Sequence, residues 1–133
     1  MSMRQNRRAV PGIAALGDHS HFFLGRIANQ GGNYSEALNE LQQALAAEPN
    51  YADPYAEEGI IYIKQRRYPA AEKALLRALA IDSDHYAANL NLMTLYQRTR
   101  DKRADEQAKR FEEVKRKRAE TAKLALRTIE VVR

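Results

Sequence analysis

Residues 34–50 read YSEALNELQQALAAEPN, and residues 68–84 read YPAAEKALLRALAIDSD. Tyrosine, alanine and leucine recur at the same places in both stretches, always with the same offset, as in the pairs Tyr34 and Tyr68, Ala37 and Ala71, Leu41 and Leu75, Ala44 and Ala78. A 34-residue period is typical of proteins built from stacked helix–turn–helix units. The repeat therefore predicts an all-α fold.

The spacing inside each stretch is that of a helix with one apolar face. Leu41, Ala44 and Leu45 follow one another at intervals that place side chains on the same side of a helix. Pro49 and Pro54 lie just beyond this stretch, and proline is poorly tolerated in a helix interior. We therefore expect helix pairs whose junctions lie near these prolines.

The repeat resembles the tetratricopeptide repeat family, whose pattern runs Trp-x2-Leu-Gly-x2-Tyr, then Ala-x3-Phe, a further Ala and a Pro. The first unit, residues 18–51, matches this pattern at Leu24, Gly25, Ala37, Leu41, Ala44 and Pro49. The second unit, residues 52–85, matches it at Tyr55, Gly59, Tyr62, Ala71, Leu75 and Ala78, with Glu58 in place of the Leu. The third unit, residues 86–114, matches it at Leu92 and Tyr96. The resemblance implies a right-handed α-solenoid of about three repeats over residues 18–114.

The third repeat departs from strict spacing in its second helix. Strict continuation of the same offset would bury three charged side chains, those of Asp105, Lys109 and Glu112. A connection that is one residue shorter places Ala104, Ala108 and Phe111 in the core instead. Burial of unpaired charges is far more costly than the loss of one loop residue, so we predict the shorter connection.

The two ends of the chain lie outside the repeats. Residues 1–17 carry three arginines and no acidic residue, and we expect a flexible arm there. One long helix is expected from Asp101 onward, and its first part caps the open end of the solenoid. Residues 115–133 extend this capping helix. Four apolar residues of the extension have nothing obvious to cover and are candidates for self-association: Leu124, Leu126, Ile129 and Val132.

Composition and motifs argue against catalysis. The 133 residues carry a net charge of +5 and contain no cysteine, which excludes disulfides and thiolate metal sites. No nucleophile motif occurs, and Gly31-Gly32 fits a turn between two helices better than a phosphate loop. The three histidines, His19, His21 and His85, do not make a metal site, which needs three or four convergent ligands. We expect a protein that is not an enzyme, with no cofactor and no metal.

No stretch approaches the roughly 20 apolar residues that span a bilayer. We therefore expect no membrane span and a cytoplasmic location. The alternative is that the sequence is a fragment of a larger, exported protein.

The resemblance implies a concave groove lined by the first helix of each repeat. The residues expected to face it are Phe22, Arg26, Asn29, Ala56, Ile60, Ile63, Lys64, Leu90, Asn91, Thr94, Gln97 and Arg98. The carboxylate clamp of the chaperone-binding members is absent, since Phe22, Glu57 and Ala87 stand at its positions. An apolar strip with polar ends suits an amphipathic helix or an extended peptide. The alternative is that the arm or the tail of the same chain covers the strip.

We therefore predict a non-enzymatic adaptor or scaffold that binds a protein or peptide, whose identity the sequence does not give. The first alternative is self-association, for example as a homodimer, through the C-terminal helix. Nucleic-acid binding through the basic ends is the alternative that the sequence favours least. Lys115-Arg116-Lys117-Arg118 has no interleaved aromatic residues on which bases could stack.

Overall fold

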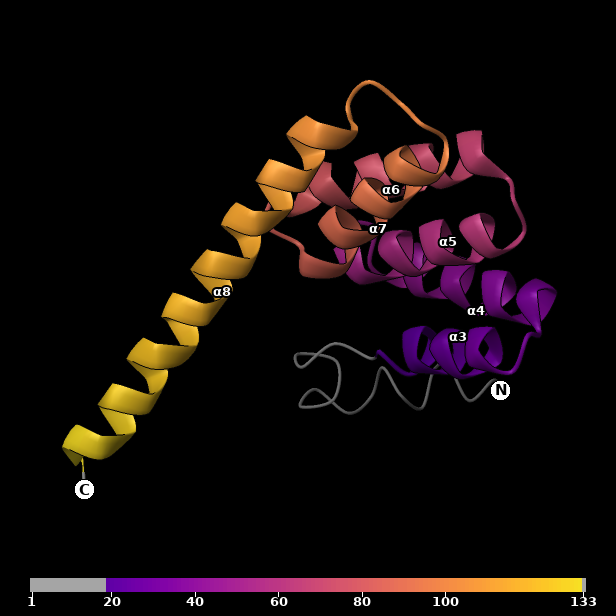
Figure 1. Ribbon diagram of the computed structural model, residues 1–133. Helices are drawn as coiled ribbons and strands as arrows, with labels where there is room; N and C mark the ends of the chain where they lie inside the picture. Colours follow the sequence, from indigo (N-terminus) through magenta and orange to yellow (C-terminus); the bar gives the residue numbers. More distant parts are fainter. Residues whose placement is uncertain (1–18, 133) are drawn as a thin grey trace, which may run out of the picture. The chain divides into compact units, whose positions relative to one another are not determined.

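The structure is a computed structural model that describes residues 19–132, with side chains described up to residue 129. The described part contains helices and no strand (Figure 1). The helices are α3 (Ser20–Gln30), α4 (Tyr34–Ala47), α5 (Ala52–Lys64), α6 (Tyr68–Ile81), α7 (Tyr86–Arg98) and α8 (Ala104–Val132). The predicted all-α helical-repeat fold is confirmed. The arm predicted over residues 1–17 lies outside the described residues.

The chain divides into two compact units, Met1–Pro49 and Asn50–Arg133, which we call the N-terminal and the C-terminal unit. In the N-terminal unit α3 packs on α4, and His21 Nδ1 lies 2.7 Å from Glu40 Oε2. Leu41 is fully buried, and a Cβ atom added at Gly25 would lie 2.8 Å from its Cδ2 atom. Glycine is therefore required where the two helices approach most closely.

The C-terminal unit repeats this arrangement and adds a second helix pair. Helices α5 and α6 pack together around Gly59 and the fully buried Leu75. Helix α7 contacts both of them, and α8 packs on α7. The core cluster of this unit consists of Ala52, Ala56, Ile63, Ala71, Leu75, Ala78, Ala88, Leu92, Leu95 and Tyr96.

The turn inside each repeat has the same backbone form. Gly32, Arg66 and Arg100 occupy equivalent places in the three repeats, and all three have positive φ, at 79°, 59° and 53°. In each turn the next amide donates a hydrogen bond of 2.8 Å to a carbonyl five residues earlier. The 34-residue period of the sequence is therefore also seen in the backbone conformation. Arg66 and Arg100 adopt the left-handed conformation that favours glycine.

The shorter third connection is confirmed, and the structure shows how the residue is lost. In the first two repeats the amides of Ala37 and Ala71 donate to carbonyls four residues earlier. In the third repeat the amide of Ala104 donates to Asp101, only three residues earlier. This tighter first turn puts Ala104 against the core and Phe111 inside it. The three charged residues of the strict register, Asp105, Lys109 and Glu112, are exposed.

Helix α8 consists of a docked half and a projecting half. Phe111 and Val114 are buried, and Arg110 donates to Asp84 Oδ1 at 2.6 Å and to the Ser83 carbonyl at 2.9 Å. From residue 115 to residue 129 every described side chain is exposed, and Figure 1 shows the helix running on past α7. No helix in the described part of the chain is long and apolar enough to cross a membrane.

Candidate protein-binding surface

The predicted groove residues of the N-terminal unit lie on α3. Arg26 is exposed, whereas Phe22 and Asn29 are buried. The Arg26 guanidinium lies 5.8 Å from the centre of the Phe22 ring, a cation–π contact. Phe22 therefore packs within its own unit and does not stand out as an apolar anchor.

On α5 two of the four predicted residues are buried in the structure. Ala56 and Ile63 belong to the core cluster and are almost fully buried. They lie seven residues apart, on nearly the same side of the helix, and this side packs into the core of the unit. Ile60 is half-buried and Lys64 is exposed, so these two are the predicted α5 side chains that reach the surface.

On α7 all five predicted residues reach the surface to some degree. Leu90, Asn91 and Thr94 are half-buried, and Gln97 and Arg98 are exposed. The Asn91 amide donates to the Ala87 carbonyl at 2.8 Å, and the Thr94 hydroxyl donates to the Leu90 carbonyl at 3.0 Å. These donors are satisfied within the helix, which makes the surface around Leu90 less polar than its composition implies.

Within the C-terminal unit α5 and α7 contact each other, so the surface residues of both helices belong to one packed pair of helices. We call Ile60, Lys64, Leu90, Asn91, Thr94, Gln97 and Arg98 the α5–α7 surface. Two aliphatic side chains are flanked here by two cationic ones, Lys64 and Arg98, at the helix ends. This pattern can hold an apolar anchor and attract an acidic neighbour.

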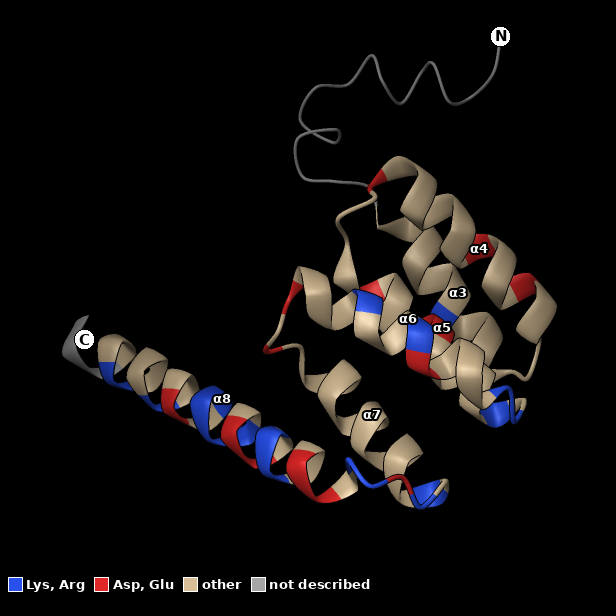
Figure 2. Cartoon of the chain, turned by 90° about the horizontal axis from the view of Figure 1, so that it is seen from above, with Lys and Arg blue, Asp and Glu red and all other residues tan. Residues whose placement is uncertain are grey.

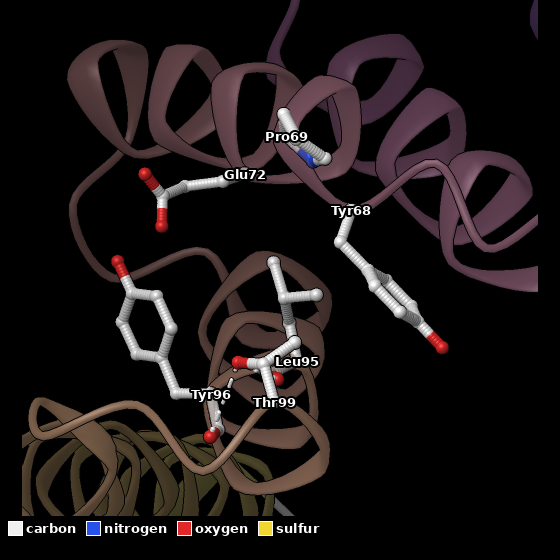
Figure 3. Close-up of a pocket in the computed structure, with 6 residues that line it drawn as sticks. All are labelled: Tyr68, Pro69, Glu72, Leu95, Tyr96 and Thr99. Atoms are coloured by element: carbon white, nitrogen blue, oxygen red, sulfur yellow. Dashed lines mark hydrogen bonds between the residues drawn. The ribbon is translucent and has the colours of Figure 1, made fainter.

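A hollow of about 240 Å³ lies between the start of α6 and the end of α7 (Figure 3). Its lining was not predicted and consists of Tyr68, Pro69, Glu72, Leu95, Tyr96 and Thr99. The Arg103 guanidinium lies 4.4 Å from the centre of the Tyr96 ring and pairs with Glu72 at 2.9 Å. Burial and the neighbouring Glu72 carboxylate raise the pKa of the Tyr96 hydroxyl. The hollow is below the usual size of small-molecule sites, and two of its polar side chains already have partners: Glu72 pairs with Arg103, and the Thr99 hydroxyl donates to the Leu95 carbonyl.

The basic run of α8 is largely engaged by neighbouring side chains. Lys115 lies 3.3 Å from Glu112, Lys117 lies 3.5 Å from Asp84, and the Arg118 guanidinium stacks 4.4 Å from the centre of the Tyr86 ring. Figure 2 shows basic and acidic residues alternating along this helix. The contacts of Lys117 and Arg118 join α8 to residues at or just before the start of α7, whereas the contact of Lys115 lies within α8.

The histidines have structural partners. His19 and His21 of the N-terminal unit pair with Glu48 and Glu40. His85 begins α7, where its Nδ1 atom accepts the Ala88 amide at 3.1 Å and its Nε2 atom lies 2.6 Å from Asp53 Oδ1. Because Nδ1 accepts, Nε2 carries the proton and donates to Asp53. Among residues 19–129, no group of three histidine, cysteine or acidic side chains is placed to hold a metal.

Glu58 is a buried carboxyl group in α5. It is 6% exposed, and its Oε1 atom has no hydrogen-bond partner in the described part of the chain. Burial raises its pKa to about 7, and the charge of Arg77 opposes this shift. In the sequence this position departs from the family pattern, which has a leucine there. The sequence does not show that the carboxyl group itself is buried.

Two exposed apolar faces lie outside the predicted groove. On the projecting half of α8, Leu124, Leu126 and Ile129 are 61–62% exposed, as expected from the sequence. Val132, the fourth predicted self-association residue, lies beyond the described side chains. On α3, Phe23, Leu24 and Ile27 are 48–63% exposed, and this face was not predicted.

Comparison with known proteins agrees with the fold. The family model described as tetratricopeptide repeat matches residues 28–93. No curated protein sequence matches the chain. Among solved structures 57 chains are similar. One of them, a crystal structure of MamA, has a TM-score of 0.64 at 24% sequence identity, covering 77% of this chain and 59% of that one. The chain thus spans less than two thirds of that neighbour, and the likeness is one of fold.

Proposed function

Because residues 28–93 make the chain a member of the tetratricopeptide-repeat family, we propose that it is a non-enzymatic scaffold that binds a protein segment on its α5–α7 surface. This family fold is generally one of protein–protein interaction. The cytoplasmic location and the lack of a cofactor remain predictions from the sequence.

The observation that supports this surface is that two helices in contact, α5 and α7, each carry a half-buried aliphatic side chain, Ile60 and Leu90. Half-burial leaves apolar area of each side chain open to a partner. The partner that fits is an amphipathic helix or an extended peptide with an aliphatic anchor. An acidic residue beside that anchor would meet Lys64 or Arg98.

The test begins with a displayed library of random peptides selected on the wild-type chain. We expect enriched peptides to combine an aliphatic anchor with acidic flanks. Ile60→Asp and Leu90→Asp should each abolish their binding. The matched control is Leu76→Asp, because Leu76 is an exposed leucine of α6 in the same unit. Helicity, followed by circular dichroism, should be unchanged in all three variants. If Ile60→Asp and Leu90→Asp both bind the selected peptides as well as the wild type does, the α5–α7 surface is not the binding site.

Self-association through the projecting half of α8 is a second candidate function. The observation that favours it is the exposure of Leu126 and Ile129, which lie three residues apart on one side of the helix. Leu124 lies about 160° around the helix from Leu126, so one partner helix cannot cover all three. The molar mass of the whole chain should then exceed that of one copy, and a chain that ends at Arg118 should be monomeric.

A further inference from the structure

The apolar side of α8 that packs on α7 continues along the projecting half. Ile129 lies eighteen positions after Phe111, and Leu126 lies eighteen positions after Ala108. Eighteen residues make five whole turns of an α-helix, so each pair shares one side. Phe111 is buried and Ala108 is partly buried, whereas Leu126 and Ile129 are 62% and 61% exposed. One continuous face is therefore covered in its first half and uncovered in its second.

Two residues of the exposed face of α3 are equivalent to residues that are buried in the later repeats. Leu24 and Ile27 are exposed, whereas Leu92 and Leu95, at the equivalent positions of α7 two repeats later, are each 2% exposed. Leu92 and Leu95 lie in the core cluster with residues of α6, the second helix of the preceding repeat. Glu58 and Ile61, at the equivalent positions of α5 in the second repeat, are buried as well. This side of α3 is thus shaped to receive the second helix of a repeat.

We propose that the projecting half of α8 in one copy docks on the Phe23–Leu24–Ile27 face of α3 in a second copy. This rests on the self-association candidate above and names its acceptor. Helix α8 is itself the second helix of a repeat, and its uncovered stripe is apolar like the face it would cover. The contact joins different surfaces of two copies, so it links copies head to tail.

Charge favours this acceptor over a contact between two α8 helices. Residues 115–129 hold six basic side chains and one acidic one, Glu120. The described residues of the N-terminal unit, 19–49, hold three glutamates and one arginine. Two α8 helices would bring like charges together, whereas residues 19–49 are opposite in sign to α8 and the whole N-terminal unit, with four arginines and four acidic residues, is neutral.

The segment that precedes α3 in the same chain is the competing occupant. Pro11 and Gly12 lie in the middle of that stretch. Proline and glycine both disfavour helix interiors. The α8 stripe has no such interruption from Ala104 to Val132.

The experiment uses two full-length variants. Leu24→Glu with Ile27→Glu disables the acceptor, and Leu126→Glu with Ile129→Glu disables the donor. All four side chains are exposed, so the fold should be kept, which circular dichroism checks. Leu76→Glu, at an exposed leucine of α6, is the control and should assemble as the wild type does. Molar mass is measured by light scattering from about 1 µM to about 1 mM, the range of weak to moderate affinity.

We expect the wild type to exceed the 15.2 kDa of one chain at the upper concentrations and each variant alone to remain monomeric. A mixture of the two variants should form a dimer and grow no further, since it retains one intact donor and one intact acceptor. If the acceptor variant assembles as the wild type does while the donor variant is monomeric, self-association through α8 stands and the α3 acceptor is wrong. A wild type that is monomeric throughout would overturn both. Peptide binding on the α5–α7 surface is read separately on the same variants.

Discussion

Leu75 packs so closely on Gly59 that a Cβ atom at position 59 would lie 2.5 Å from Leu75 Cδ2 and 2.6 Å from its Cγ. Leu75 is fully buried, so it cannot swing away. The same relationship joins Gly25 to Leu41 one repeat earlier. The spacing of these two helix pairs therefore depends on a missing side chain in the first helix.

Gly59→Ala should destabilise the protein despite alanine's better helix propensity. Overpacking typically costs about 1–3 kcal/mol, and the propensity gain offsets about 1 kcal/mol of that. We expect a net loss of up to about 2 kcal/mol in the free energy of unfolding, measured by urea denaturation. Gly31→Ala is the control, since a Cβ atom there meets nothing closer than 3.6 Å. A Gly59→Ala protein as stable as the wild type would refute the close approach.

Arg66→Gly should stabilise the protein, because Arg66 has φ of 59°. The left-handed conformation costs about 1–2 kcal/mol for a residue with a Cβ atom, and the greater freedom of glycine in the unfolded chain offsets about 0.5–1 kcal/mol. A gain of about 0.5 kcal/mol or more should appear as a higher urea midpoint. The reverse change, Gly32→Ala at φ of 79°, should lower the midpoint. Shifts of the opposite sign would mean that these turns are not strained.

Glu58 should make the stability of the fold depend on pH. Its pKa is raised from 4.5 to about 7, so between these values the folded chain keeps a proton that the unfolded chain has lost. Stability therefore falls as pH rises through this window, by up to about 3 kcal/mol.

Glu58→Gln removes this titration and should leave stability nearly unchanged at about pH 4 but raise it at about pH 8. Glu58→Leu, which restores the family residue, should show the same dependence on pH. The measurement is the difference in the free energy of unfolding between each variant and the wild type across this range. A difference that is constant with pH would show that Glu58 ionises normally in the folded chain.

Phe111 should hold the docked half of α8 in place. It is buried, and its ring centre lies 5.2 Å from that of Tyr86. Phe111→Ala should lower the free energy of unfolding by about 3 kcal/mol or more and speed amide exchange in residues 104–118. Leu126→Ala, in the projecting half of the same helix, should have little effect on a monomeric sample. Equal effects of the two changes would contradict the division of α8 into halves.

The sequence predicted the fold through its most regular features. The constant offset between repeats predicted the helix pairs, and the cost of burying Asp105, Lys109 and Glu112 predicted the shortened connection. The left-handed backbone at Arg66 and Arg100 was not predictable. Of the three equivalent turn positions, only the first carries a glycine, Gly32.

The surface was predicted less completely than the core. The first-helix rule of the family placed Ala56 and Ile63 on the groove, but the seven-residue spacing between them follows the buried side of α5. The exposed face of α3 was missed because its residues look like core residues. The α5–α7 surface remains a prediction that only binding can test.

The most direct test of the scaffold is the amide-exchange footprint of a selected peptide on the wild-type chain. We predict slower exchange in α5 and α7, over residues 52–64 and 86–98, with no change in residues 119–129 of α8. Protection confined to α4, α6 or α8, with α5 and α7 unaffected, would contradict the account and place the binding site elsewhere.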